Sequence, residues 1–198
     1  MIDRVELAPG YSVCRVINGL WQLSEGHRSE AVDSRRAVRM LLELADAGLT
    51  TFDCADIYTG VEALVGEFLA RNRTGSDPVS VRVHTKYVPD LDALPALRRA
   101  DVQRIIDRSL RRLGQERLDM VQFHWWDMEV PGYVEAAGWL QELQQAGKID
   151  RLSLTNFNTR ATRAILEAGI PLAYRSVSGP RSMGFDGPFP AVAREMDW

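Results

Sequence analysis

Short apolar runs alternate with amphipathic segments along most of the chain. The apolar runs are short enough for strands, and the segments between them carry apolar residues at the three- and four-residue spacing of helices. The predicted strands cover residues 13–20, 49–52, 79–85, 118–123, 149–155 and 169–173. The predicted helices cover residues 33–47, 61–70, 101–113, 133–146 and 159–168. A small hairpin, turning at Pro9 and Gly10, is expected before the first strand.

Capping residues support several of these helix boundaries. Asp33 and Asp101 stand where an N-cap side chain would accept a hydrogen bond from the first turn. Gly48 and Gly114 follow the ends of two helices, where a left-handed conformation closes the last turn.

Regular strand–helix alternation predicts a parallel sheet with right-handed crossovers. An open doubly wound sheet and a closed (β/α)8 TIM barrel both fit that pattern. A dinucleotide-binding doubly wound sheet needs a glycine-rich turn after its first strand, and residues 18–22 do not supply one. The α/β barrel is therefore favoured. It would be incomplete, with about six of eight strands, because eight units typically take about 250 residues.

The pattern stops near residue 174. Residues 174–198 are rich in glycine and proline and show no helix or strand period. We therefore divide the chain into a partial barrel at 1–173 and an irregular tail at 174–198.

Composition narrows the functional classes. The chain has 198 residues, of which 45% are hydrophobic and 26% charged, and its formal net charge is −3. These values are typical of one soluble globular core and provide no general attraction for nucleic acid or an anionic membrane. With no apolar run of about 20 residues, a charged N-terminus and only two cysteines, a cytoplasmic location is expected.

Polar side chains follow four successive predicted strands at the point where each strand ends. They are Asp53, Lys86, His124 and Asn156, each about one βα unit from the next. A closed barrel brings such strand ends to one rim, where barrel active sites are built. We therefore expect one shared site.

Tyr58 lies five residues beyond Asp53 and completes this group. A phenol titrates near ~10 in water, so it donates a proton at neutral pH only with help from its surroundings. The ammonium of Lys86 would favour the phenolate, Asp53 would hold that ammonium charged, and His124 would orient a carbonyl oxygen. The set suits general-acid assistance to hydride delivery onto a carbonyl carbon.

Other polar residues receive structural interpretations. His27 and His84 lack the paired spacing of metal ligands, so no metal site is expected, and His84 is taken as a satisfied or partly exposed strand residue. Cys54 is interpreted as a small packed residue rather than a nucleophile. A run of arginines in the third helix is assigned to its outer, solvated side: Arg104, Arg108, Arg111 and Arg112.

Three segments resemble the aldo-keto reductase family. Residues 52–58 (Phe-Asp-Cys-Ala-Asp-Ile-Tyr) are similar to its Asp-x-Ala-x-x-Tyr signature. Residues 109–114, together with 118–125, are similar to a second signature, and residues 152–157 resemble the strand-five Ser-Asn-Phe segment. The resemblance runs from about residue 12 to about residue 173.

The resemblance implies a (β/α)8 barrel that reduces aldehydes or ketones with NADPH, less often NADH. It carries the catalytic tetrad onto Asp53, Tyr58, Lys86 and His124, with Tyr58 as the acid. It further implies that the cofactor is bound by Asp53 and by four other residues: Gly19, Leu20, Thr155 and Asn156. The substrate pocket would have apolar walls from four aromatic residues: Trp21, Tyr87, Trp125 and Trp126.

The tail departs from the family pattern. After Ala173 we find neither the glutamine and stacking tyrosine of strand seven nor the basic residues that follow strand eight. A reading-frame shift near residue 174 is one explanation, since permitted codons for residues 174–183 allow a shifted frame that resembles strand seven. Two functions therefore stay open: an NAD(P)H-dependent carbonyl reductase acting on a small molecule, and a truncated, catalytically impaired barrel with a binding or regulatory role.

Overall fold

The computed structural model describes residues 2–27 and 32–176. The chain starts with an antiparallel hairpin of β1 (Arg4–Ala8) and β2 (Tyr11–Cys14), as predicted. The prediction of one strand over residues 13–20 is wrong. Residues 13 and 14 belong to the hairpin, where the Cys14 N–H donates to Thr51 Oγ1 (2.9 Å), and the next strand, β3, covers only Asn18–Gly19.

A six-stranded parallel sheet forms the centre of the molecule. Its strands are β3, β4 (Thr51–Asp53), β5 (Arg82–Tyr87), β6 (Leu118–His124), β7 (Ile149–Thr155) and β8 (Arg175–Ser176). They pair in chain order, β3-β4-β5-β6-β7-β8. A doubly wound sheet reverses its strand order at a switch point, whereas a barrel does not. The observed order is therefore that of six successive strands of a (β/α)8 barrel.

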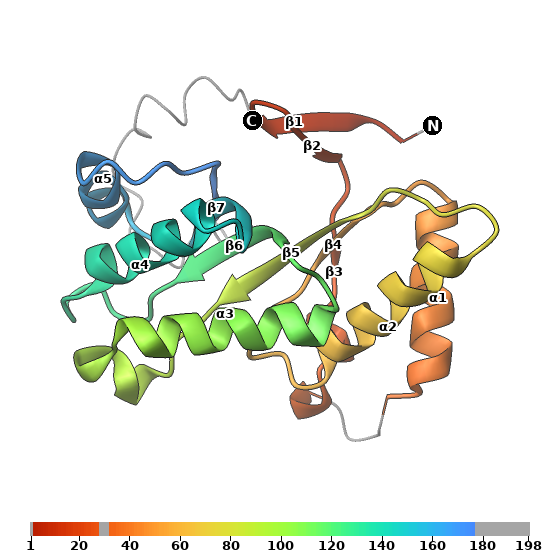
Figure 1. Cartoon of the computed structure of the whole chain (residues 1–198), viewed down its shortest axis with the longest axis horizontal. Helices are drawn as coiled ribbons and strands as arrows, with labels where there is room; N and C mark the ends of the chain where they lie inside the picture. Colours follow the sequence, from red (N-terminus) through yellow and green to blue (C-terminus); the bar gives the residue numbers. More distant parts are fainter. Residues whose placement is uncertain (1, 28–31, 177–198) are drawn as a thin grey trace.

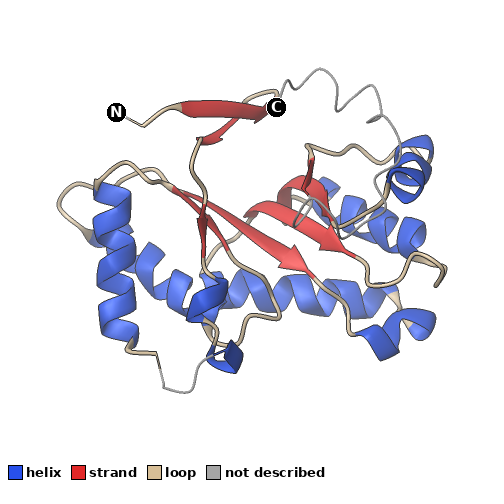
Figure 2. Cartoon of the chain, turned by 180° about the vertical axis from the view of Figure 1, so that it is seen from behind, coloured by secondary structure: helices blue, strands red, loops and turns tan. Residues whose placement is uncertain are grey.

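Five helices connect these strands. They are α1 (Ser34–Asp46), α2 (Val61–Thr74), α3 (Arg99–Leu113), α4 (Tyr133–Gln145) and α5 (Thr159–Glu167), with short 3-10 turns at Trp21–Leu23, Glu25–His27 and Leu91–Ala96. Figures 1 and 2 show the longer helices below the sheet and the β1–β2 hairpin as a separate layer above it.

The helix boundaries confirm one predicted cap and correct another. Asp33 is the N-cap of α1, and its carboxylate accepts the Arg36 N–H at 3.1 Å. The N-cap of α3 is Arg98 rather than Asp101. Asp101 is the third helical residue, and its carboxylate turns back to accept the Arg98 N–H at 3.2 Å. An acidic residue at either place satisfies an orphan N–H, so the sequence alone does not separate the two.

Side chains alternate between the two faces of the sheet. The face toward the helices is apolar, and there Phe52 packs against Phe68 of α2 with ring centroids 5.0 Å apart. The opposite face, which is the barrel interior, carries the polar residues of the same strands. Because successive strand residues point to opposite faces, every second residue near a strand end reaches the interior.

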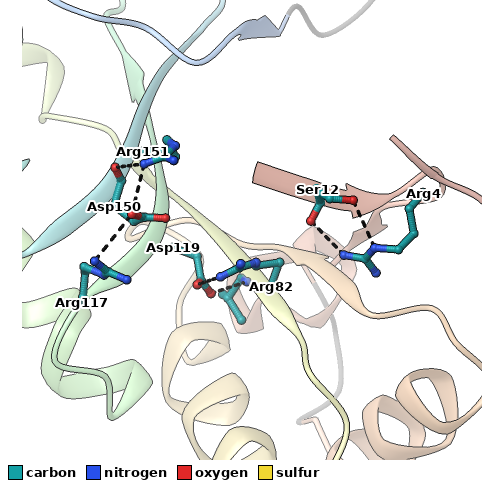
Figure 3. Close-up of polar contacts among 8 residues, drawn as sticks. Arg4, Ser12, Arg82, Arg117, Asp119, Asp150 and Arg151 are labelled. Carbon is teal, nitrogen blue, oxygen red and sulfur yellow. Dashed lines mark hydrogen bonds and ion pairs between the residues drawn. The ribbon is translucent and has the colours of Figure 1, made fainter. Parts of the chain in front are cut away.

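The hairpin packs against the end of the barrel where the strands begin. Tyr11 is fully buried there, with the guanidinium groups of Arg82 and Arg151 at 5.1 and 5.8 Å from its ring centroid. Arg82 is paired with Asp119 at 2.9 Å, and Arg151 with Asp150 at 3.2 Å, as Figure 3 shows. Paired charges therefore line this end of the barrel.

The last strand lies later than predicted. We expected residues 169–173 to begin this strand, but Gly169 closes α5 with φ of +77°, and β8 covers Arg175–Ser176. Residues 177–198 of the predicted tail lie outside the described residues. Within the described part of the chain, no helix combines the length and the apolar character needed to span a membrane.

Candidate active site

The strand ends place the four predicted polar residues on one rim of the barrel. Asp53 ends β4, Lys86 lies one residue before the end of β5, His124 ends β6 and Asn156 follows β7. The register aligns Lys86 with Gln122 and His124 with Thr155 on neighbouring strands.

The Asp53 carboxylate is the centre of a hydrogen-bond network. One of its oxygens accepts from Lys86 Nζ and the other from Gln122 Nε2, and Lys86 Nζ also donates to the Cys54 carbonyl oxygen at 2.8 Å. The Lys86 side chain is 15% exposed and that of Asp53 24%. Our sequence reasoning missed Gln122, although it lies two residues before His124 on the same face of β6. Strand alternation could have found it.

Tyr58 lies in the loop between β4 and α2, where its N–H donates to the Ala55 carbonyl oxygen at 3.1 Å. Lys86 Nζ is 5.2 Å from the centroid of its half-buried ring. The predicted proximity of the tyrosine and the lysine is therefore present, with the ammonium over the aromatic face.

His124 is buried beside these groups. Its Nδ1 is 3.4 Å from the Thr155 carbonyl oxygen, and its buried Nε2 has no hydrogen-bond partner among the described residues. Burial lowers the pKa of His124, and the positive charge of Lys86 lowers it further, although the Thr155 contact opposes both. A neutral imidazole with an open ring nitrogen can exchange a hydrogen bond with a bound molecule.

Tyr58, Lys86 and His124 border a hollow of about 270 Å³. Its lining comprises Trp21, Ala55, Ile57, Tyr58, Lys86, Val88, His124, Trp126, Thr155 and Asn156. Trp126 stands edge-on to His124 with centroids 4.6 Å apart, and its indole N–H donates to the Pro89 carbonyl oxygen at 2.7 Å. The hollow thus combines apolar walls with a few convergent polar groups, as small-molecule sites do.

Two aromatic residues predicted for the pocket lie elsewhere. Tyr87 and Trp125 are fully buried and do not line the hollow. Both pack against Phe123 in the apolar layer between sheet and helices. Each directly follows an inward-facing residue, Lys86 or His124, so alternation turns it to the opposite face. The expectation that they form pocket walls is therefore corrected.

Of the residues predicted for cofactor binding, some line the hollow and others do not. Thr155 and Asn156 line the hollow, and Asn156 has a positive φ of 62°. Gly19 pairs with Asp53 in the sheet but does not line the hollow. The Leu20 side chain lies in the core, and only its backbone N–H reaches the site, donating to the Asp53 carbonyl oxygen at 2.9 Å.

The structure also places the residues that the sequence analysis interpreted as structural. Cys54 is fully buried, and burial raises the pKa of its thiol. His84 is also fully buried, not partly exposed, its Nε2 has no partner among the described residues, and burial lowers its pKa to about 4. No group of three or more possible metal-ligating side chains occurs in residues 2–27 and 32–176.

The predicted solvated position is confirmed for Arg104, Arg111 and Arg112, which are exposed, whereas Arg108 is half-buried, and the prediction missed that two of these arginines reach buried carboxylates. Arg108 contacts the carboxylate of Asp56 at 3.3 Å, and Arg112 contacts that of Glu62 at 3.3 Å. Both carboxylates are only 1% exposed. Arg104 fits the prediction, since it is 66% exposed and pairs with Asp101 within its own helix.

Comparison with known proteins agrees with this geometry. The Aldo/keto reductase family profile matches residues 15–178. The uncharacterized oxidoreductase YcsN of Bacillus subtilis is 30% identical over 181 residues, and oxidoreductase YdhF of Escherichia coli is 30% identical over 189. Each alignment covers 86% of this chain, which spans 58% of either relative's length.

Solved structures show the same fold. Glycerol dehydrogenase from Gluconobacter oxydans superposes with a TM-score of 0.71 at 27% identity, covering 88% of this chain and 54% of that one. A Bombyx mori aldo-keto reductase in complex with NADP superposes with a TM-score of 0.72 at 21% identity, covering 90% and 59%. The family match, the strand order and the position of the rim residues agree, and the chain belongs to the Aldo/keto reductase family.

Proposed function

We propose that this chain takes part in the reduction of small aldehydes or ketones by a nicotinamide cofactor, with Tyr58 as the proton donor. The observation that carries the proposal is the convergence of Tyr58, Lys86 and His124 on one hollow at the rim of the barrel. The Asp53 carboxylate lies directly behind Lys86 and binds it.

The protein groups have distinct parts in this reaction. Asp53 pairs with the Lys86 ammonium and holds it in place, and this positive charge beside the Tyr58 ring attracts the negative charge that develops as the phenol releases its proton. His124, neutral and with its proton on Nδ1 toward the Thr155 carbonyl oxygen, has an Nε2 lone pair that can accept a hydrogen bond from the hydroxyl that forms as the carbonyl is reduced. Trp21 and Trp126 shield the reacting atoms from water.

Thr155 and Asn156 fit the nicotinamide. Both residues line the hollow, one strand beyond β6 from Lys86, and a hydroxyl and an amide side chain together offer a carboxamide both a donor and an acceptor. The bound nicotinamide supplies the hydride. We favour NADP(H) over NAD(H), because the Bombyx mori structure similar in fold was solved with NADP.

Cofactor titration tests this proposal directly. We expect the fluorescence of NADPH to fall or to shift on titration with the protein, and we expect NADPH to be oxidised when an aromatic aldehyde is added. NADH in a parallel titration should bind more weakly. Failure of both nucleotides to bind at high micromolar concentration would contradict the proposal and favour a non-catalytic barrel.

A further inference from the structure

The loop that carries Tyr58 is attached to the neighbouring strand through Asp56. The Asp56 N–H donates to the Lys86 carbonyl oxygen at 3.2 Å, and its Oδ1 accepts the Val88 N–H at 3.1 Å. Asp56 therefore holds the backbone on both sides of Tyr87, at the end of the strand that carries Lys86. Tyr58 follows only two residues later.

Helix α3 holds the same residue from behind the sheet. Arg108 donates to Asp56 Oδ2 at 3.3 Å, and Arg112 donates to the Asp56 carbonyl oxygen at 3.1 Å. The carboxylate is 1% exposed, while the Arg108 side chain is 37% exposed. The two arginines thus reach inward from a partly solvated helix to a buried acceptor.

A second buried link runs parallel to the first. Glu62, in the first turn of α2, accepts from Arg112 at 3.3 Å and from the Thr85 hydroxyl at 2.7 Å. The backbones of α2 and α3 approach closely at this place, since a Cβ on Gly66 would lie 2.1 Å from the Arg112 carbonyl oxygen. Strand β5, helix α2 and helix α3 therefore meet around the loop that contains Tyr58.

Burial of these charged groups costs desolvation free energy. Two carboxylates are buried near each other, and burial together with the charge of Glu62 raises the pKa of Asp56 to about 7. Buried ion pairs are often replaceable by apolar residues without loss of stability. Here the buried hydrogen bonds fix the position of the loop backbone, because each has a defined donor and acceptor geometry.

We propose that Asp56 is a positioning residue, which with Arg108 sets the Tyr58 loop against Lys86 for the reaction proposed above. Asp56 does not border the hollow, although its neighbours Ala55 and Ile57 do. It therefore acts through the loop backbone rather than on a bound molecule. The inference rests on the proposed function for its kinetic consequence, whereas its structural consequence can be measured without turnover.

Substitution of Asp56 should separate rate from binding. A displacement of the proton donor by about 1 Å costs roughly 100-fold in rate, so Asp56→Ala should lower kcat by roughly 10- to 100-fold. The KM for NADPH should not change, because Thr155 and Asn156 lie beyond another strand. Asp56→Asn should restore only part of kcat, since its amide oxygen can still accept the Val88 N–H but its amide nitrogen cannot accept from Arg108.

Two arginines of α3 provide a matched pair of variants. Arg108→Gln removes the charge that faces Asp56, whereas Arg104→Gln removes an equal charge whose partner, Asp101, lies on the surface of the same helix. We expect the first to lower kcat and the second to leave it unchanged. If Asp56→Ala does not fold, Arg108→Gln decides the matter, and wild-type kcat there would overturn the proposal.

Hydrogen–deuterium exchange tests the loop independently of activity. Asp56→Ala should accelerate exchange in the segment 54–60 and leave the α4 and α5 helices at their wild-type rates. Unchanged exchange in 54–60, or acceleration spread evenly over the chain, would overturn the positioning role. If the wild type oxidises no NADPH, the proposed function fails, and the exchange pattern still decides whether Asp56 holds the loop.

Discussion

Each end of the barrel has a tyrosine next to a cation that is paired with a carboxylate, but the surroundings of the two tyrosines differ. At the end where the strands begin, Tyr11 lies against the guanidinium groups of Arg82 and Arg151, and each arginine is paired with a carboxylate. The tyrosine is fully buried. The hairpin fills this end, and the charges there are neutralised.

At the rim the same kind of contact borders a hollow. Lys86 lies over the Tyr58 ring at 5.2 Å and is paired with Asp53, as an arginine is paired at the other end. Tyr58, however, lines a hollow of about 270 Å³, and the buried Nε2 of His124 lacks a partner among the described residues.

The difference separates the cluster that we propose to be reactive from a structural one. Cation, carboxylate and tyrosine occur at both ends, so residue types alone do not identify the site. Space next to the tyrosine does, because an unpartnered buried polar atom occurs at both ends, Tyr11 Oη at one and His124 Nε2 at the other, whereas of the two tyrosines only Tyr58 lines a hollow among the described residues. Substitutions at the two ends should therefore separate stability from activity.

The largest effect is expected from Tyr11→Ala. Removal of a fully buried aromatic side chain should lower the free energy of unfolding by about 3–5 kcal/mol. The kcat of the folded fraction should not change. Val5→Ala, at a 39% exposed position of the same hairpin, is the control and should stay within about 0.5 kcal/mol of wild type in urea denaturation. A loss of kcat without loss of stability in Tyr11→Ala would contradict a purely structural role for the hairpin end.

Lys86→Met, in contrast to Tyr11→Ala, should lower kcat more than it lowers stability. Loss of the cation to which we assign stabilisation of the developing phenolate should lower kcat by roughly 100- to 1,000-fold. Arg82→Met removes the corresponding cation at the other end, and it should reduce stability but not kcat. Steady-state NADPH oxidation and urea denaturation of both variants measure this. Equal losses of kcat would show that the two ends do not differ in function.

His84 makes the barrel interior sensitive to acid. Its folded-state pKa is about 4 against an ordinary value of 6.5, so the unfolded chain binds this proton first as the pH falls. The stability that depends on neutral His84 is complete above pH 6.5 and is lost toward pH 4, by about 3 kcal/mol in total. His84→Gln should therefore flatten the pH dependence of the urea midpoint in that window. The same acid slope in variant and wild type would refute this assignment.

Gly66→Ala should have the smallest of these effects. The added Cβ would meet the Arg112 carbonyl oxygen at 2.1 Å, and separation of α2 from α3 should cost about 1–3 kcal/mol. Gly138 lies in α4 with nothing within 4 Å of its would-be Cβ. Gly138→Ala should thus stabilise the protein by about 0.5–1 kcal/mol. Thermal melts that rank the two alanines the other way would contradict the close contact.

Sequence patterns predicted the long elements well and the short ones poorly. The strand at Ile149–Thr155 was predicted with its observed bounds, because seven residues with capped helices on either side carry a clear signal. The two-residue strands β3 and β8 are defined only by pairing with their neighbours, so no local pattern could place them.

The site shows the same limit at the level of side chains. Asp53, Lys86 and His124 were found because strand ends meet at one rim. Tyr87 and Trp125 were misplaced because proximity in sequence was given more weight than alternation. The buried partners of Arg108 and Arg112 come from a different loop and a different helix, so the spacing of charges along α3 could not reveal them.

The central claim is that Tyr58 donates the proton, and one pair of variants tests it most directly. With NADPH and an aromatic aldehyde, Tyr58→Phe should lower kcat by roughly 100- to 10,000-fold while the Kd for NADPH stays at the wild-type value. Tyr87→Phe, which removes a buried hydroxyl with no partner among the described residues, should leave kcat unchanged. Wild-type turnover in Tyr58→Phe, or an equal loss in both variants, would contradict the account.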